Sequence, residues 1–427
     1  MLLCILAAGA AIRYRSLSWN RYEHGDIALY GSAAESIVRE GNFRVPFDLS
    51  SPHWYSVQKL GGRFYELYPL WSIIGAGGIK LVSLSGFQSL KLFSFLAGIA
   101  LIAVSFFVGK AFANARVGMF CAACASFSYL LTDYSANGAF YGFQAMLYLL
   151  LVWILYRLQT LRHVLLAGVV MGLALLVNFQ SVALVPAFVA FLFLEYRRDL
   201  KKFFVFSLTG LGIVFVMFLP WLIREYILFG NPFYFIEFAA TYTWQKIGAL
   251  TVIKDNVKML VKSKELYLAL LKKTLFFWLP HNLHYVNRKL FILTPMAYIG
   301  AWFLGIEAWF SGTNKEMIRK VALIFLVLFF HILLSVIFPI VKFRYFVPMV
   351  PLVFLAGGIY FDMQKPRLRN ILMAGTIILV LAGSWLTYRS VPSHTYYYDG
   401  AITTDIFGNQ GERDFIQAAQ DNASVEE

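Results

Sequence analysis

The chain has 427 residues, of which 59% are hydrophobic and only 14% are charged, and its formal net charge is +14. A soluble globular protein of this length could not bury so much apolar surface, which excludes that class. Apolar blocks of membrane-span length recur along the chain and predict an all-α polytopic membrane protein. The positive charge lies mainly between these blocks, so it favours contact with anionic membrane lipids and not with nucleic acid.

About eleven segments are candidate membrane spans, the first of them shorter than a full span. They are residues 1–12, 90–109, 117–133, 140–156, 163–178, 180–195, 203–222, 290–310, 321–340, 346–362 and 371–387. Basic residues in the connections after alternate spans outnumber those in the short connections opposite by fourteen to two. The first set is Lys110, Arg116, Arg157, Arg162, Arg197, Arg198, Lys201, Lys202, Lys315, Arg319, Lys320, Lys365, Arg367 and Arg369, and the second is Lys342 and Arg344. The positive-inside rule places the first set in the cytoplasm.

The segment 69–86 is also apolar, but it contains four glycines and a central lysine, Lys80. If it crossed the membrane, every basic connection would move to the outer side. We therefore predict a re-entrant or surface-lying outer helix here. The resulting organisation is a transmembrane domain over residues 1–387, with large outer loops at 13–89 and 223–289. Residues 388–427 form a polar outer tail, consistent with the start of a truncated outer domain.

The first outer loop contains a short amphipathic helix that is predicted to begin at Asp26 and to stop at Gly41. Apolar residues recur at helical spacing between them, an aspartate is a favoured N-cap, and a glycine is a favoured stop. Asp26 could serve only as this cap. Alternatively, it could act as the general base for an acceptor hydroxyl or amine at the outer surface. One carboxylate can do both, because its oxygens offer several acceptor sites.

Two arginines in the outer connections are candidates for binding a phosphate. Arg224 follows Pro220 and Trp221 at the end of a span, where it is either an ordinary interfacial arginine or a ligand for a lipid phosphate. Arg344 lies on the side where basic residues are scarce, so a phosphate partner would explain its position. Residues 254–275 predict a basic amphipathic helix on the membrane plane, for which attraction to anionic lipid is the simplest explanation.

The remaining polar candidates are weaker. Asp133 lies near the outer end of a span, where it is either a helix cap or a second carboxylate facing the same compartment. His24 and His53 show no metal-ligand spacing, and Cys121 and Cys124 lie inside an apolar block, where small residues pack helices together. The sequence leaves open whether a divalent metal ion takes part.

Four motifs in order along the chain carry a resemblance to a known family. They are Asp26 before an Ala-rich helix that ends in Gly41; Tyr68-Pro69 opening an apolar stretch; P-W-x-x-R-x-x-x-x-F-G-x-P from Pro220 to Pro232; and R-Y-x-x-P-x-x-P from Arg344 to Pro351. Together they resemble the polyprenyl-phosphate-dependent integral-membrane glycosyltransferases of the GT-C fold. This broad group contains the protein O-mannosyltransferases and the lipid A aminoarabinose transferase.

The resemblance implies a GT-C-like bundle with outer juxtamembrane helices and assigns a role to each motif. Asp26 would be the catalytic carboxylate, with Glu23 and Asp133 as secondary acid candidates. The donor phosphate would be bound by Arg224 and Arg344. The aromatic residues of the motifs, Tyr68, Trp221 and Tyr345, would line the donor and acceptor cavity.

The sequence departs from the family at two points. Ile27 stands where many members have a second acid, and Tyr68 stands where some members have a phosphate-binding lysine. Lys59 and Arg63 are the candidates to replace that lysine.

The implied activity is transfer of a sugar from a polyprenyl-phosphate donor to a lipid, glycan or protein acceptor, at the outer face of the inner (cytoplasmic) membrane. Two other classes stay open: a transporter or flippase, and an enzyme like the O-antigen ligases or polymerases, which uses a diphosphate-linked glycan. A transporter should carry ionisable residues along a path through its spans, whereas most acids here lie in the outer loops.

Overall fold

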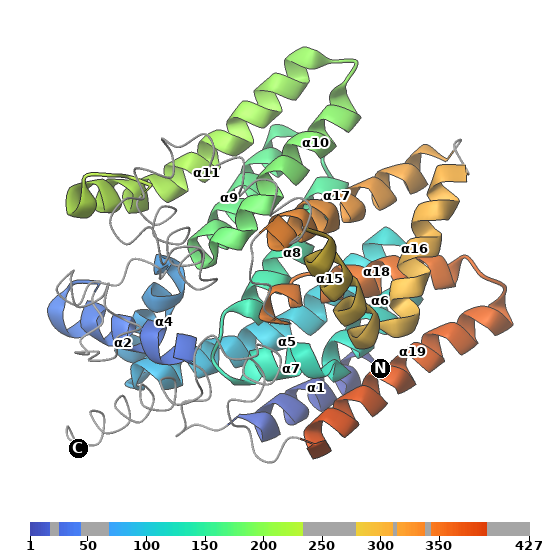
Figure 1. Cartoon of the computed structure of the whole chain (residues 1–427), viewed down its shortest axis with the longest axis horizontal. Coiled ribbons are helices and arrows are strands. Elements are labelled where there is room, and N and C mark those ends of the chain that lie inside the picture. Colours follow the sequence, from blue (N-terminus) through green and yellow to red (C-terminus); the bar gives the residue numbers. More distant parts are fainter. Residues whose placement is uncertain (18–24, 44–67, 234–278, 311–313, 338–342, 391–427) are drawn as a thin grey trace.

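The computed structural model describes residues 1–17, 25–43, 68–233, 279–310, 314–337 and 343–390. Every regular element within these ranges is an α-helix or a short 3₁₀ helix, as Figure 1 shows. The prediction of an all-α chain is therefore confirmed.

The helices follow the predicted apolar blocks closely. Their bounds are α1 Leu2–Ser16, α2 Gly25–Glu40, α4 Pro69–Val82, α5 Gly86–Phe112, α6 Ala115–Phe127, α7 Tyr129–Ala136, α8 Tyr141–Tyr156, α9 Leu161–Val177, η2 Phe179–Ala183, α10 Leu184–Tyr196, α11 Leu200–Phe229, α15 Leu279–Leu293, α16 Pro295–Phe310, α17 Lys315–Ile337, η4 Phe343–Phe346, α18 Val350–Asp362 and α19 Pro366–Ser390.

When helices are judged by their length and composition, fewer of them qualify as membrane spans than the sequence predicts. Five helices of the described ranges are long and apolar enough to cross a bilayer, and up to seven cross if each bent helix pair is one span. Several of the other predicted spans correspond to apolar helices of 10–17 residues, such as α8, α9 and α18. The chain is thus a multi-pass membrane protein, and the predicted count of about eleven is not confirmed.

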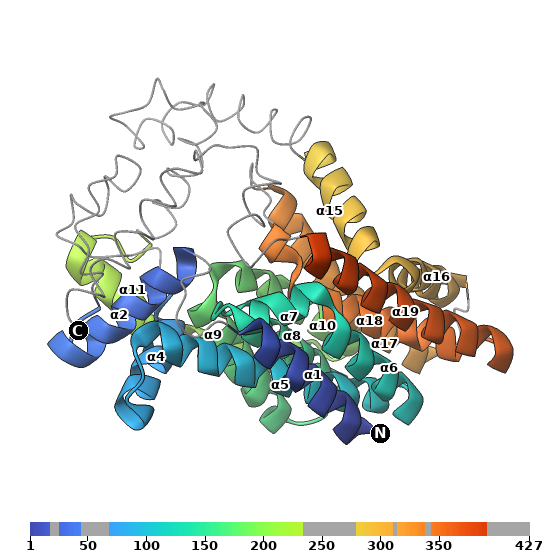
Figure 2. The ribbon, with the colours of Figure 1, turned by 90° about the horizontal axis from the view of Figure 1, so that it is seen from below.

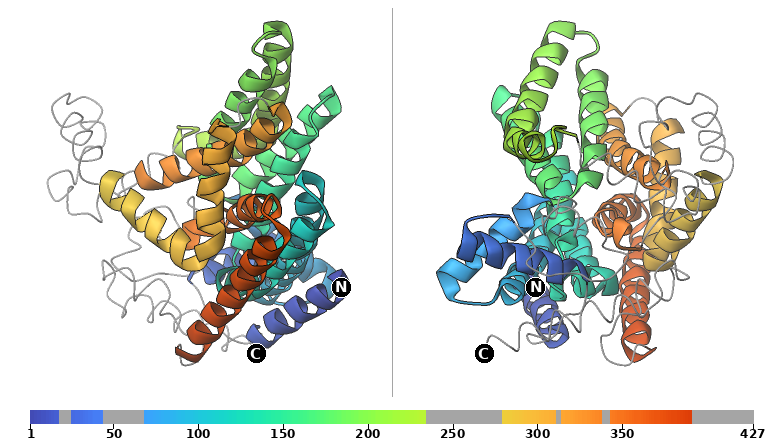
Figure 3. Two further views of the ribbon diagram at one scale, coloured as in Figure 1. Left: turned by 90° about the vertical axis from the view of Figure 1, so that its right-hand side faces the viewer. Right: turned by 60° about the vertical axis from the view of Figure 1, so that its left-hand side comes forward.

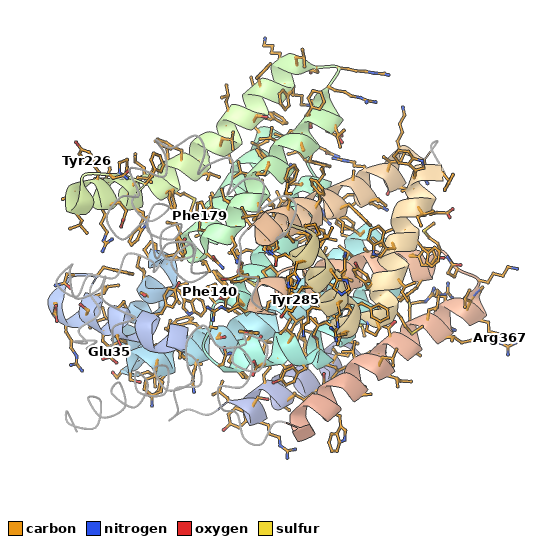
Figure 4. All side chains as sticks on the ribbon, viewed as in Figure 1. Glu35, Phe140, Phe179, Tyr226, Tyr285 and Arg367 are labelled. Carbon is orange, nitrogen blue, oxygen red and sulfur yellow. The ribbon has the colours of Figure 1, made fainter. Side chains whose placement is uncertain are left out.

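The bundle has two distinct ends. In Figure 1, α2 and α4 lie at the left, whereas the α10–α11 connection lies at the top and the α18–α19 connection at the right. Figure 4 likewise places Glu35 and Tyr226 at the left and Arg367 at the far right. The basic connections at the top and right are therefore remote from α2, in agreement with the charge asymmetry.

The predicted span 117–133 is broken into α6 and α7, which bend by 59° at Ser128. Side chains from other helices bind the carbonyl groups that the break leaves without a helical partner. Arg13 of α1 donates from Nη2 to the Ala125 carbonyl at 2.9 Å and from Nη1 to the Ser126 carbonyl at 3.1 Å. The Ser384 hydroxyl of α19 donates to the Phe127 carbonyl. The break is thus stabilised by specific hydrogen bonds from α1 and α19.

Helix α1 extends beyond the predicted first span and includes Arg13. The sequence indicates a span over 1–12 followed by a loop, but α1 continues to Ser16 and the Arg13 side chain is completely buried. In a hydropathy pattern, a charged residue marks the end of a span. Here the arginine lies inside the protein, because its guanidinium forms hydrogen bonds with backbone carbonyls.

The predicted span 290–310 is also broken, because α15 and α16 meet at an angle of 117°. Pro295 begins α16, and a proline cannot continue the hydrogen bonding of the preceding helix. Figure 3 shows the two helices as the arms of a V in its left panel. Only α16 corresponds to the apolar part of the predicted span.

Helix α4 fulfils the prediction of a separate, short helix in the segment 69–86. Its 14 residues reach about 21 Å, less than the hydrocarbon core of a bilayer. It ends at Ser83, whose φ of 55° is left-handed, and α5 begins anew with a capping box between Ser85 and Gln88. The outer location of α4 stays a prediction.

Helices α2, α4 and α5 pack as one unit through small residues. A Cβ atom on Gly86 of α5 would lie 2.2 Å from the carbonyl oxygen of Gly31 on α2, so the two backbones are in direct contact. The backbone N–H of Gly86 also donates to Oε1 of Glu35 on α2 at 2.9 Å. Figure 2 shows α2 and α4 side by side at the left of the bundle. Helix α2 is therefore fixed to the bundle along its length.

Candidate functional site

Asp26 lies in the first turn of α2, one residue after Gly25, where the helix begins. The sequence predicts Asp26 at the N-cap, with Ile27 as the first helical residue, but the helix begins two residues earlier than that, so Asp26 is its second residue. The predicted stop is confirmed, because Gly41 follows the helix with a φ of 66°. Its side chain lies outside the described atoms. The next residue, Ile27, is completely buried and fixes the start of α2 against the rest of the protein.

The turn between α7 and α8 forms the surface against which α2 begins. Gly138 in this turn has a φ of 83°, and a Cβ atom there would lie 2.0 Å from Cδ1 of Ile27. The Gly138 carbonyl accepts a hydrogen bond from Nε1 of Trp71 on α4 at 2.9 Å. The Ser94 hydroxyl on α5 donates to the Ala139 carbonyl at 2.9 Å. Three helices thus hold the turn that positions Asp26.

Replacing Gly138 by alanine should lower the free energy of unfolding by about 2–3 kcal/mol, since it adds left-handed strain and a clash with Ile27. Thermal unfolding of the purified protein, together with its activity, would measure this. Gly41→Ala is the matched control, because Gly41 is also left-handed but has no atom within 4 Å of a Cβ. Equal losses in the two variants would show that Ile27 is not held by this turn.

Asp133 belongs to the same part of the molecule. It is half-buried on α7, one helical turn before Asn137, whose side chain accepts a hydrogen bond from the Ala139 backbone N–H. Asp133 therefore lies on the helix that leads into the turn against which α2 begins.

Lys91 is a functional candidate that the sequence reading missed. It lies in the second turn of α5 and is completely buried, and a Cβ atom on Gly138 would lie 3.1 Å from its Cγ. A fully buried lysine is rare unless its charge is compensated. It went unnoticed because position 91 falls inside the predicted span 90–109. A cation within a predicted span is the signal that could have identified it.

Arg344 lies on the short helix η4 and meets α8 close to the same turn. Its guanidinium carbon is 6.0 Å from the centre of the Tyr141 ring, and Tyr141 is the first residue of α8. The Tyr141 ring packs against Phe140 and Tyr134, with ring centres 4.3 and 5.1 Å away. Phe140 in turn contacts Tyr30 of α2. Aromatic rings therefore connect Arg344 to the helix that carries Asp26.

Arg224 is held in a different place, at the other end of α2. Its guanidinium lies over the rings of Trp221 and Phe43, with centres 4.4 and 5.3 Å away. Its Nη1 donates to Oε1 of Glu225 at 2.6 Å. Phe43 follows the C-terminal end of α2, and that end is about 21 Å from Asp26 along the helix axis. Arg224 thus belongs to the far end of α2.

Replacing only one partner of the Arg224–Glu225 pair should reduce the free energy of unfolding more than replacing both. Arg224→Met leaves a carboxylate that is completely buried, for an expected loss of about 2 kcal/mol, moderated because 21% of the arginine side chain is exposed. The double variant Arg224→Met/Glu225→Leu should recover most of that loss. Thermal unfolding of the three proteins tests this, and additive losses would show that the two residues do not stabilise one another.

The predicted site residues thus form two groups in the described part of the chain. Asp26, Asp133, Arg344 and Tyr345 gather near the α7–α8 turn, whereas Arg224 and Trp221 lie at the far end of α2. Tyr68 is half-buried and immediately precedes α4. The remaining candidates, Glu23, Lys59 and Arg63, lie outside the described residues, as do His24, His53 and the predicted basic helix 254–275.

Over the described ranges, no group of three or more His, Cys, Asp or Glu residues is placed to hold a metal ion. Cys121 and Cys124 are buried free thiols within the helix packing of α6.

Comparisons with known proteins give two kinds of similarity. Residues 69–223 match the family model described as dolichyl-phosphate-mannose-protein mannosyltransferase. No curated protein matches the sequence significantly over its length.

Solved structures resemble nearly the whole chain. ArnT from Cupriavidus metallidurans bound to undecaprenyl phosphate matches 92% of this chain with a TM-score of 0.57 at 15% identity. The oligosaccharyltransferase of Archaeoglobus fulgidus in its apo form matches 98% of this chain with a TM-score of 0.59 at 14% identity. The same oligosaccharyltransferase tethered to an acceptor peptide matches 90% with a TM-score of 0.56 at 11% identity.

These proteins are longer than the present chain, which spans 66% of ArnT and 64% of the apo oligosaccharyltransferase. At such low identity, the similarity concerns the arrangement of helices. The family match over residues 69–223 agrees with it, since this region includes α4 to α10 and most of α11. The chain therefore has the GT-C fold that is shared by the polyprenyl-phosphate-dependent membrane glycosyltransferases.

Proposed function

We propose that the protein is a membrane glycosyltransferase that moves a hexosyl or pentosyl group from a polyprenyl-phosphate donor to a lipid, glycan or protein acceptor. The reaction takes place at the end of the bundle that contains α2, on the outer face of the cytoplasmic membrane. The observation that carries this proposal is the fold similarity over 92% of the chain to ArnT, a protein whose structure holds undecaprenyl phosphate.

The position of α2 supports a catalytic role for Asp26. The helix begins at a turn held by α4, α5 and Ile27, and the second acid, Asp133, lies on α7, the helix that leads into this turn. Fixed geometry of this kind suits proton transfer, which requires hydrogen-bond distance between the base and the acceptor.

In the proposed reaction, Asp26 accepts the proton of the acceptor hydroxyl or amine as that group attacks the anomeric carbon. The bond between the sugar and the phosphate oxygen breaks, and the polyprenyl phosphate leaves with the electron pair. Arg344 stabilises the negative charge that develops on the phosphate. This single displacement inverts the anomeric configuration, as the resemblance implies. A divalent metal ion is an optional further participant, and no step depends on it.

The charge asymmetry supports the outer orientation. The end with α2 is remote from the basic α10–α11 and α18–α19 connections, which the positive-inside rule assigns to the cytoplasm. Arg224 is proposed to interact with the lipid-linked donor farther from the reacting carbon.

A deletion strain tests the proposal directly. The lipids, glycans and proteins of the cell envelope would be compared by mass spectrometry in the wild type, the deletion and the complemented strain. We expect one sugar mass to disappear from one acceptor class and to return on complementation, with accumulation of a polyprenyl-phosphate sugar in the deletion.

Accumulation of a sugar-diphosphate lipid would point instead to an enzyme of the ligase or polymerase type. Unchanged envelope sugars, with altered distribution of a lipid or solute across the membrane, would support a transporter and contradict the proposal.

A further inference from the structure

His331 is an ionisable residue in the interior of α17 that none of the four motifs contains. Its side chain is completely buried among apolar residues of the bundle. Ionisable side chains are costly in a membrane-spanning segment and are usually retained for a function. Its contacts show what it does here.

Both ring nitrogens of His331 form hydrogen bonds. Nε2 is 2.9 Å from the backbone carbonyl oxygen of Tyr345 on η4, and Nδ1 is 2.9 Å from the hydroxyl of Tyr148 on α8. A carbonyl oxygen can only accept, so Nε2 carries the hydrogen in this pair. In the neutral ring, Nδ1 then accepts a hydrogen bond from the Tyr148 hydroxyl. The imidazole therefore bridges α8 and η4 with its donor and acceptor both used.

Tyr148 is itself fixed by its surroundings. It is completely buried, and its ring meets the imidazole edge-on with centres 5.3 Å apart. One turn earlier on α8, Gln144 donates from Nε2 to the Ser181 hydroxyl of η2 at 3.0 Å. The α8 end of the bridge is thus held by several contacts, and the bridge joins the Tyr345 carbonyl of η4 to it.

The bridge and Arg344 contact the same face of α8. Tyr141 and Tyr148 are seven residues apart, which is two helical turns or about 10 Å. Arg344 lies over the Tyr141 ring, while the carbonyl of the next residue, Tyr345, is bound at the level of Tyr148 through His331. Two successive residues of η4 are therefore attached to α8 at two points, one through a side chain and one through the backbone.

We propose that His331 is a positioning residue that orients Arg344 toward the donor phosphate by holding the Tyr345 carbonyl against Tyr148. The inference rests on the proposed function, because it takes Arg344 as a ligand of that phosphate. Without the bridge, the Tyr345 carbonyl loses its attachment to α8, while the buried Phe346 still holds the end of η4. The guanidinium of Arg344 is then less restricted in its position over Tyr141.

The test measures binding of polyprenyl monophosphate, without any sugar, to the full-length protein in lipid nanodiscs. His331→Leu removes both hydrogen bonds at similar side-chain size, whereas His331→Gln keeps an amide donor for the Tyr345 carbonyl. Tyr148→Phe removes only the hydroxyl that orients the imidazole. We expect Kd to rise about 10-fold for His331→Leu and about 3-fold or less for the other two variants.

A double-mutant cycle separates positioning from general stability. In an Arg344→Gln background, His331→Leu should produce no further change in Kd, because the group that it positions is absent. Equal losses in both backgrounds would overturn the proposal, and so would an unchanged Kd in His331→Leu. If His331→Leu does not fold, the same cycle with Tyr148→Phe decides between these outcomes.

Failure of this inference is distinguishable from failure of the proposed function. If Arg344→Gln leaves Kd unchanged while the deletion strain still lacks one sugar, the positioning role is wrong and the transferase assignment stands. If neither the sugar profile nor phosphate binding depends on the protein, both are wrong.

Discussion

Replacing Asp26 by asparagine is expected to lower the transfer rate about 1,000-fold. Asparagine has nearly the same size and keeps an oxygen that can accept a hydrogen bond at the helix start, but it cannot take up a proton. General base catalysis contributes about 10²- to 10⁴-fold, and that contribution should be lost while the helix remains intact. The measurement is kcat of the purified variant with a polyprenyl-phosphate sugar, together with Kd for polyprenyl phosphate, which should change little.

Glu40→Gln is the matched control, since Glu40 is an exposed carboxylate at the other end of α2. Its activity should stay close to that of the wild type. If Asp26→Asn were as active as this control, Asp26 would serve only at the helix start, and the base would have to be sought at Asp133 or Glu23.

Replacing Arg13 by methionine should lower the free energy of unfolding by about 3–4 kcal/mol, although Arg13 itself does not contact the candidate site. The guanidinium donates to three carbonyls, those of Gly9, Ala125 and Ser126. Methionine fills much of the same space but leaves backbone acceptors buried without a donor at the α6–α7 break. The loss should appear as a lower midpoint of thermal unfolding in detergent or nanodiscs.

Arg15→Met provides the comparison, because Arg15 is exposed on the same helix. We expect it to change the midpoint by less than about 1 °C. Arg13→Lys should fall between the two, since an ammonium group keeps the charge but cannot present the planar fork that reaches two successive carbonyls. A midpoint for Arg13→Met equal to that of Arg15→Met would mean that the break is stabilised elsewhere.

The sequence predicts most helices because each of them coincides with a block of apolar residues, and hydropathy detects such a block from its local composition alone. The ranges 140–156 and 163–178, for example, agree with α8 and α9 within two residues at each end. It could not predict the break at Ser128, because the partners that satisfy the interrupted backbone come from the remote helices α1 and α19. The break at Pro295 has a signal in the sequence, the proline itself, but the hydropathy pattern continues across it. Hydropathy alone therefore describes a bent pair as one straight span. The division into a domain over 1–387 and a tail over 388–427 stays a prediction.

The candidate site was predictable only where a motif occupies a loop or a helix end. Asp26, Arg224 and Arg344 stand out because charged residues are scarce in an apolar chain. Lys91, Glu225 and His331 did not stand out, since each is buried in a helix that the hydropathy pattern describes as apolar. The contacts of Lys91 and His331 come from other elements, namely the α7–α8 turn, α8 and η4. The family resemblance implies that Arg224 and Arg344 bind one phosphate together. In the structure, Arg344 contacts Tyr141 of α8, whereas Arg224 contacts Trp221 and Phe43 at the far end of α2.

The contact between Gly31 and Gly86 limits the residues that these two positions accept. Because the backbone of α2 touches that of α5, neither position accepts even alanine without displacing the helix that carries Asp26. A larger residue at either position would therefore displace α2 and, with it, Asp26. Substitutions at these two glycines would thus change the position of Asp26 without any contact with its side chain.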